Sequence, residues 1–204
     1  VLQPISPYLP IQGMELLEDF APPEIRSQLY LDVLEEDVIC GKLEFVYDAM
    51  HFTAFEEKNK RICNLQKEMR AEHGVLQYFT YHPDDPHHPL LLTGEAEIYR
   101  LITEGIPLLS KEMELYASDR FQRITVRPPV RPTIGIRPDN NLLELDIHAE
   151  GYDQEELLEL LSAYRRGQKY HRLRDGSFTI LTESGIGAFS ELAEGLNLTN
   201  KEIL

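Results

Sequence analysis

Residues 142–178 read LLELDIHAEGYDQEELLELLSAYRRGQKYHRLRDGSF, and their pattern predicts a strand, a helix and a hairpin in that order. The first seven of these residues alternate between apolar and polar side chains, which predicts a strand with one buried face. Asp153 stands three residues before Glu156, the spacing of a capping box, so a helix is predicted to begin there. Leucines then recur at helical spacing up to Gly167, which can take the left-handed conformation that ends a helix. Beyond it, the pair Asp175-Gly176 predicts a hairpin with a two-residue turn.

The sequence before this stretch predicts an antiparallel sheet covered by helices. Apolar and polar residues alternate over 29–33 and again over 43–47, on either side of an acidic tip, which favours a hairpin. A further strand is predicted at 114–118. Helices, each closed by a glycine, are predicted at 64–73, 93–104 and 182–194. In the first of them, Leu65 and Met69 share one face, which is expected to cover the sheet.

The order of these elements indicates the fold class. Strands and helices follow one another without regular alternation, so we predict an α+β fold, with antiparallel sheets and hairpins packed against several short helices. Repeated prolines in 127–138 favour an extended link or an edge strand. Two subdomains could meet there, with a break near 118–138. Residues 1–24 contain spaced prolines and are predicted to form an extended arm, as in an excised piece of a longer protein.

Composition excludes several classes of protein. The chain has 204 residues and a formal net charge of −15, which opposes general attraction to a phosphate backbone. It contains no apolar run of the ~18 residues that span a bilayer, and its first four residues lack the basic and apolar regions of a signal peptide, so we expect a cytoplasmic protein without a membrane partner. Cys40 and Cys63 lack zinc-ligand spacing and are expected to be free thiols.

Several motifs, taken in order, resemble the accessory region of bacterial Swi/Snf-type helicases. They are Glu97 to Gly105 with Ile106-Pro107-Leu108-Leu109, Tyr116-Ala117-Ser118, Arg127-Pro128-Pro129, Leu142 to Asp146, the helix 155–164, and YHRLRDGSF at 170–178. The resemblance covers residues 25–204. It implies a helicase-associated domain whose ATPase motor lies downstream, in a protein that would be an ATP-dependent DNA translocase. One departure is Arg61-Ile62-Cys63-Asn64, where the family has an Arg-Asp pair, so no role is transferred to that aspartate.

The resemblance raises the question whether this chain contains the ATP-binding motifs of the helicase motor. A helicase motor needs a glycine loop that ends in Gly-Lys-Ser/Thr and an acidic pair that holds magnesium. The only Gly-Lys pair here is Gly41-Lys42, which lies inside a strand pattern. We therefore expect no catalytic residue, no metal and no cofactor in this chain. ATP and magnesium are expected only in the motor outside it.

Basic residues are the candidate contact site. Two stretches without acidic residues, 120–138 and 165–174, together hold half of the 20 lysines and arginines. If the hairpin at Asp175 folds beside the Arg127 strand, the two stretches could form one positive face for DNA phosphates or for the motor. The candidate contacts are Arg127, Arg131, Arg165, Arg166, Lys169, Arg172 and Arg174. Ordinary charges of an edge strand and of a helix C-terminus would explain the same residues.

Two alternative functions remain open. A metal-dependent enzyme could use His82, Asp84, Asp85, His87 and His88, or the strand face of Glu144, Asp146 and His148. Three prolines favour a solvated loop for the first group, and a wet strand face explains the second equally well. A protein-interaction domain without DNA contact is the other alternative, and the net charge favours it. The sequence thus predicts a non-catalytic accessory module that contacts the motor, DNA or both.

Overall fold

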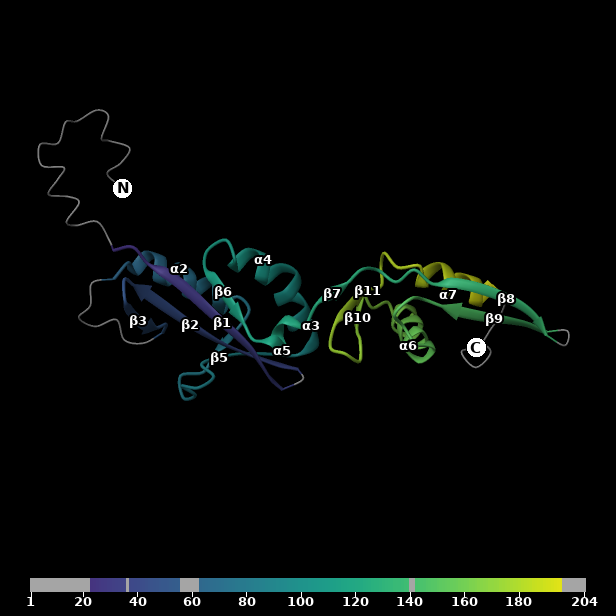
Figure 1. Cartoon of the computed structure of the whole chain (residues 1–204), viewed down its shortest axis with the longest axis horizontal. Helices are drawn as coiled ribbons and strands as arrows, with labels where there is room; N and C mark the ends of the chain where they lie inside the picture. The colour runs from purple at the N-terminus through teal and green to yellow at the C-terminus, as the bar shows by residue number, and fades with distance from the viewer. Residues whose placement is uncertain (1–22, 36, 56–62, 140–141, 196–204) are drawn as a thin grey trace, which may run out of the picture.

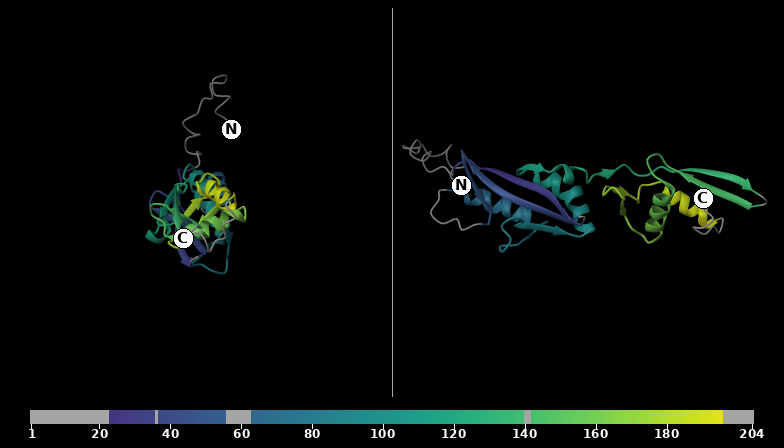
Figure 2. Two further views of the ribbon diagram at one scale, coloured as in Figure 1. Left: turned by 90° about the vertical axis from the view of Figure 1, so that its right-hand side faces the viewer. Right: turned by 60° about the horizontal axis from the view of Figure 1, so that its bottom comes forward.

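The computed structural model describes residues 23–35, 37–55, 63–139 and 142–195. Two groups of helices and strands lie end to end and give an elongated molecule (Figures 1 and 2). We call the described residues of 23–124 the first lobe and those of 125–195 the second lobe. The mixture of helices with mainly antiparallel strands confirms the α+β class. The predicted arm, 1–24, lies almost wholly outside the described residues.

The first lobe is built on a six-stranded sheet. Strands β1 (Arg26–Glu35) and β2 (Val38–Tyr47) pair antiparallel with Leu29 opposite Leu43, which confirms the predicted hairpin. Strand β6 (Glu114–Ala117) confirms the predicted strand and pairs parallel to β1. The sheet order is β4-β5-β2-β1-β6, with β3 paired to β2. The bounds of the three short strands are β3 Met50–Thr53, β4 Thr80–Tyr81 and β5 Leu90–Thr93.

Helices cover one face of this sheet and leave the other face open. Leu29, Leu31 and Leu43 point inward and are at most 3% exposed, because alternate residues of a strand face the core. They pack against helix α2 (Leu65–Leu76) and against a continuous helical segment. That segment comprises α3 (Glu95–Arg100), the wide turn η1 (Leu101–Gly105) and α4 (Ile106–Leu109). A short helix, α5 (Asp119–Gln122), follows β6. The outward residues of β1 and β2 therefore remain available to solvent.

Helix α2 differs from the prediction in its end and in its buried face. Asn64 caps its N-terminus, since the Asn64 side chain accepts a hydrogen bond from the Lys67 amide at 3.2 Å. The helix nevertheless continues through Gly74 to Leu76. Leu65 and Met69 are 51% and 57% exposed, so the predicted covering face is wrong. The helix buries Glu68 instead, and the Tyr47 hydroxyl, which donates to its carboxylate at 2.7 Å, makes that burial tolerable.

The next predicted helix is also longer than expected. It begins after Gly94 rather than Thr93, and it passes through Gly105 to Leu109. The Ile106 amide donates to the Leu101 carbonyl, five residues back, and this wide turn places Pro107 in the first turn of α4, where no amide donor is needed. A Cβ at position 105 would lie 2.9 Å from Leu101 Cδ1. Gly105 thus permits close packing and does not end the helix.

The second lobe contains the strand, helix and hairpin predicted from residues 142–178. Strands β8 (Thr133–Asp139) and β9 (Leu142–His148) form an antiparallel ribbon. Helix α6 (Gln154–Arg165) follows, and then β10 (Tyr170–Arg172) and β11 (Phe178–Ile180), which pair antiparallel. Strand β7 (Val126–Arg127) adds parallel to β11. The last helix is α7 (Ile186–Gly195).

Short-range sequence signals determine where helix α6 begins and ends and where the hairpin turns. Asp153 and Glu156 form the predicted capping box, with the Glu156 amide 2.7 Å from the Asp153 side chain. Gly167 ends α6 with a φ of +75°, and the Gln168 amide donates to the Ala163 carbonyl, as in a Schellman motif. The hairpin has a three-residue loop rather than the predicted two, because the Leu173 amide still bonds the Ser177 carbonyl.

Helix α7 begins four residues later than predicted. The amide and the hydroxyl of Ser184 both donate to the Leu181 carbonyl, which closes a turn where the helix was expected to run. The first helical bond joins the Phe189 amide to the Gly185 carbonyl. Phe189 and Ala193 are fully buried. Gly195 is the last residue of the helix rather than a cap beyond it.

Each lobe has its own hydrophobic core, and the change of core falls between Ile124 and Val130. Phe178 of β11 nevertheless belongs to the core of the first lobe. Tyr99 of α3 stacks on Tyr170 of β10, with ring centroids 3.9 Å apart. The lobes therefore share a packed aromatic joint. Their predicted status as two subdomains stays a prediction. None of the described helices combines the length and the apolar character needed to cross a membrane.

Candidate functional site

The structure brings the two basic stretches together in the second lobe. Strand β11 pairs with β7 so that Thr179 lies opposite Arg127, which places the hairpin beside the Arg127 strand. This juxtaposition was the condition for a joint positive face. Arg137 belongs to the part of β8 whose side chains are not described, and Arg120 and Arg123 are exposed at the end of the first lobe.

Four of the seven candidate residues form ion pairs with described residues, and three of them, Arg127, Arg172 and Arg174, do so at the β10–β11 hairpin. Arg127 lies 2.5 Å from the Asp175 carboxylate, and Arg172 pairs with Asp37 at the tip of the β1–β2 hairpin. Arg174 contacts carboxylates of helix α6, with Glu155 and Glu159 each at 3.0 Å. These partners cancel much of the positive charge that the sequence suggested. The three arginines hold the hairpin to the rest of the fold.

The Arg127–Asp175 pair is partly protected from solvent. Burial raises the pKa of the Asp175 carboxyl, but hydrogen bonds from Ser177 and then from Arg127 outweigh that effect and hold it below its ordinary value of 3.8. The Arg127 guanidinium also lies over the Tyr152 ring, 5.7 Å from its centroid. Arg127 is therefore fixed in position.

The other four candidates lie near the C-terminal end of α6 or in the segment that leads to β8. Arg165 donates to the Ser190 hydroxyl at 3.3 Å and lies 3.9 Å from Glu194. Arg131, Arg166 and Lys169 are exposed and form no ion pair with any described residue. Cations at a helix C-terminus are stabilised by the helix dipole without a carboxylate. We call Arg131, Arg166 and Lys169 the open cations and Arg127, Arg172 and Arg174 the paired cations.

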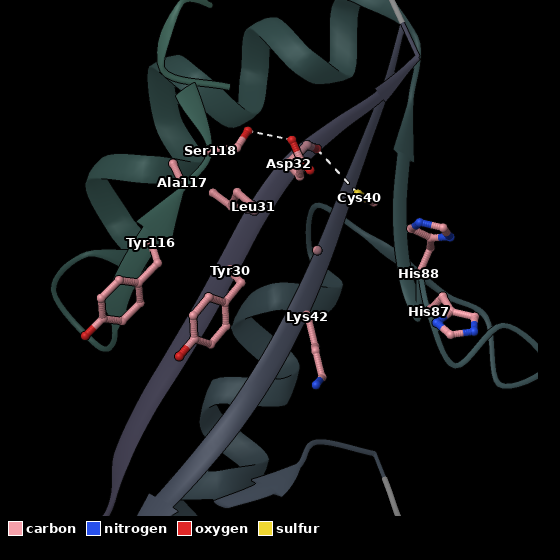
Figure 3. A pocket seen from close by; sticks show the side chains of 11 residues that line it. Tyr30, Leu31, Asp32, Cys40, Lys42, His87, His88, Tyr116, Ala117 and Ser118 are labelled. Carbon is pink, nitrogen blue, oxygen red and sulfur yellow. Dashed lines mark hydrogen bonds between the residues drawn. The ribbon is translucent and has the colours of Figure 1, made fainter. Parts of the chain in front are cut away.

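A groove that sequence reasoning missed lies on the open face of the first lobe's sheet (Figure 3). It has a volume of about 480 Å³ and is formed by β1, β2, β6 and the loop before β5. Tyr30 and Tyr116 stack on one side of it, with ring centroids 5.1 Å apart and an interplanar angle of 17°. His87 and His88 lie on the other side, and Lys42 lies between the two sides. Alternation in β1 places Tyr30 outside, but no local signal pairs it with Tyr116.

Carboxylates around the groove are held ionised. The hydroxyl of Ser118, 2.5 Å away, and then the Val33 amide lower the pKa of Asp32. Burial raises the pKa of Glu44, but its contacts with Lys42, at 2.7 Å, and His51 lower it overall. Burial, followed by the charge of Asp32, raises the pKa of the Cys40 thiol. The groove thus combines fixed charges of both signs with exposed aromatic rings.

The sequence candidates for metal binding and for phosphate binding have other roles here. Asp85 Oδ1 accepts hydrogen bonds from the His87 and His88 amides at 3.0 and 2.9 Å, which folds the loop 82–89 on itself. Within the described ranges, no three His, Cys, Asp or Glu side chains are placed to hold a metal ion. Gly41-Lys42 lies inside β2, as the strand pattern predicted. His148 is exposed, and the side chains of Glu144 and Asp146 are outside the description.

Comparison with known proteins gives one family. The family model described as "Bacterial SNF2 helicase associated" matches residues 1–204, the whole of the chain. No curated protein and no solved structure matches.

Proposed function

Because the chain belongs to the bacterial SNF2 helicase-associated family, we propose that it is a non-catalytic accessory module of a bacterial ATP-dependent DNA translocase. The observation that carries this proposal is the family match along all 204 residues. ATP and magnesium bind in the motor, which is another part of the same protein. The module helps to position or restrain that motor on DNA.

A positioning module must present its surface in a fixed orientation, and the joint between the lobes supports this role. The stacked rings of Tyr99 and Tyr170 both meet the edge of Phe178, and Arg172 of the second lobe pairs with Asp37 of the first. Packed aromatic contacts of this kind resist relative motion, since any shift exposes apolar surface to water. The two lobes therefore act as one body.

The surface that we propose to meet DNA is that of the open cations. A duplex attracts a protein by releasing counterions, and only cations that are free to approach phosphates contribute. Arg131, Arg166 and Lys169 meet this condition, whereas the paired cations already neutralise carboxylates. Arg165, which Ser190 holds at the same end of α6, supports the same surface.

The test compares two variants of the whole motor-containing protein. In one, the three open cations are replaced by alanine, and in the other the three paired cations are. Both change the formal net charge by the same amount, so general electrostatic effects cancel. If each open cation contacts one phosphate, the plot of log affinity against log salt concentration is shallower by about 2.7 for the open-cation variant. Between 50 and 200 mM salt, the DNA affinity of that variant then falls by a factor about 40-fold smaller than the affinity of the unsubstituted protein does. The paired-cation variant keeps the slope and loses thermal stability.

An equal slope in the unsubstituted protein and in the open-cation variant would contradict DNA contact by this surface. The net charge of −15 favours a second candidate in that event, a contact with the motor alone. Under that candidate, the open-cation variant binds duplex DNA normally but loses DNA-stimulated ATPase activity. Affinity and ATPase activity measured on the same samples separate the two candidates.

A further inference from the structure

The proposed function does not use the groove on the open sheet face. Its side wall is the stacked pair of Tyr30 and Tyr116, which are 38% and 45% exposed although they are large aromatic residues. Exposed aromatic rings that gather in a hollow typically mark a binding surface, whereas scattered ones need no explanation. The open cations lie in the other lobe, so an experiment can refute a role for this groove without refuting the proposed DNA contact, and the reverse.

Hydrogen bonds fix the two rings before any ligand arrives. The Tyr30 hydroxyl donates to Gln28 Oε1 at 3.0 Å, and the Tyr116 hydroxyl donates to Glu114 Oε2 at 3.0 Å. Gln28 Nε2 joins the two by donating to Glu114 at 2.8 Å. Both hydroxyls are thus engaged as donors, and the rings offer apolar surface in a fixed orientation. Such preorganisation lowers the entropy cost of binding.

The sequence of the chain contains a segment with matching chemistry. Residues 4–10 read PISPYLP, with a proline at every third position. A polyproline II helix repeats every three residues, so these prolines would share one face, and such segments dock in grooves lined by aromatic rings. Proline lacks an amide donor, so the segment is rich in acceptors. Lys42 in the middle of the groove and His87 and His88 on its far side supply donors.

We propose that the groove binds residues 4–10 of its own chain, as a polyproline II ligand packed against Tyr30 and Tyr116. The chain between this segment and the sheet is long enough for the segment to reach the groove. From residue 10 to residue 25, the chain can extend over about 50 Å, and Tyr30 lies five residues into the sheet from there, or about 17 Å. Residues 4–10 lie outside the described part of the chain, and their sequence and tether length select them as the occupant. A segment tethered in this way has an effective concentration on the order of 1 mM.

The test uses the full chain with Pro4, Pro7 and Pro10 replaced by alanine. A matched control replaces Ser6 and Gln12 instead and keeps every proline. In amide NMR spectra, the proline variant is expected to shift the signals of Tyr30, Tyr116 and their neighbours, and the control is not. A labelled peptide of residues 1–12, added in trans, should bind the proline variant about tenfold more tightly than the unsubstituted chain, for an intrinsic Kd of about 0.1 mM.

Three outcomes would overturn the proposal. Unchanged groove signals in the proline variant would show that residues 4–10 do not occupy the groove. Equal affinity of the peptide for chains with and without Tyr30→Ala would place the peptide elsewhere, and His87→Ala repeats the test if that variant does not fold. A dimeric mass in sedimentation that the proline variant loses would assign the groove to the segment of a second copy.

Discussion

Replacing Tyr99 and Tyr170, singly and together, tests whether the two lobes form one body. The rings stack with centroids 3.9 Å apart at an interplanar angle of 11°, and each meets the edge of Phe178, at 5.4 and 5.8 Å. Tyr170 is buried enough that burial, followed by the charge of Glu95, raises its pKa. The pair is therefore well placed to couple the cores.

The expected magnitudes follow from buried area. A half-buried tyrosine ring removes about 100 Å² of apolar surface from water, so each alanine substitution should lower the free energy of unfolding by about 2.5 kcal/mol. A stacked pair contributes a further coupling of about 1 kcal/mol. The double variant should therefore lose about 1 kcal/mol less than the sum of the single losses, because each single substitution already breaks the stack.

Urea denaturation followed by circular dichroism measures these free energies. The chain contains no tryptophan, so tyrosine fluorescence serves only as a second probe of the same transition. Tyr78→Ala is the matched control, since Tyr78 contacts Arg100 within the first lobe and should combine additively with Tyr170→Ala. Additive losses for Tyr99 and Tyr170, within about 0.3 kcal/mol, would refute the coupling.

Other variants test the local reasoning. Gly105→Ala should cost about 1 to 3 kcal/mol in urea denaturation because its Cβ would crowd Leu101 at 2.9 Å, whereas Gly74→Ala, whose Cβ would meet Leu109 at an ordinary 3.6 Å, should stabilise the chain by up to about 1 kcal/mol. Equal effects would refute the packing argument. Asp153→Ala should cost about 1 kcal/mol through loss of its cap, and an unchanged melting temperature would contradict this. The lowered pKa of Asp175 implies that its contribution is present above its unfolded pKa, near 4, and is lost as the pH falls through the lower folded pKa. Asp175→Asn should therefore be less stable than the unsubstituted chain at pH 7, with a difference that narrows below about pH 4. A pH-independent difference would argue against the ion pair.

The sequence predicted the elements whose signals are short-range. The capping box of Asp153 and Glu156 and the left-handed Gly167 each involve residues a few positions apart, so the structure reproduces them. The β1–β2 hairpin was predicted for the same reason, since its two strands are joined by a short acidic tip. A local pattern of this kind carries its own physical cause and does not depend on the rest of the fold.

Glycines misled the prediction where tertiary packing decides their role. Gly74 lies within α2 and Gly105 within a continuous helix, and neither has the positive φ that Gly167 has. A glycine that ends a helix and one that allows close packing look alike in a sequence. The difference depends on Tyr78 and Leu101, which approach position 105 only in the folded chain.

The candidate site was predicted in part. The meeting of the two basic stretches was stated only as a condition, because β8, β9 and α6 separate β7 from β11 in the sequence and no local signal pairs them. The acidic partners did not follow either, because Asp37 pairs with Arg172 from the other lobe and Glu159 pairs with Arg174 from helix α6. The tyrosine groove was missed for the same reason, since the parallel pairing of β6 with β1 joins distant parts of the chain.

The excess of acidic residues limits how the open cations can approach DNA. The chain has 35 acidic side chains for 20 lysines and arginines. Arg131, Arg166 and Lys169 form no ion pair with any described residue, and the acidic body around them opposes approach to DNA by the module alone. The contact with phosphates that we propose therefore requires that the motor already hold the duplex, which raises its local concentration to the millimolar range. The module by itself is expected to bind DNA weakly, and only the intact protein can show the effect of the open cations.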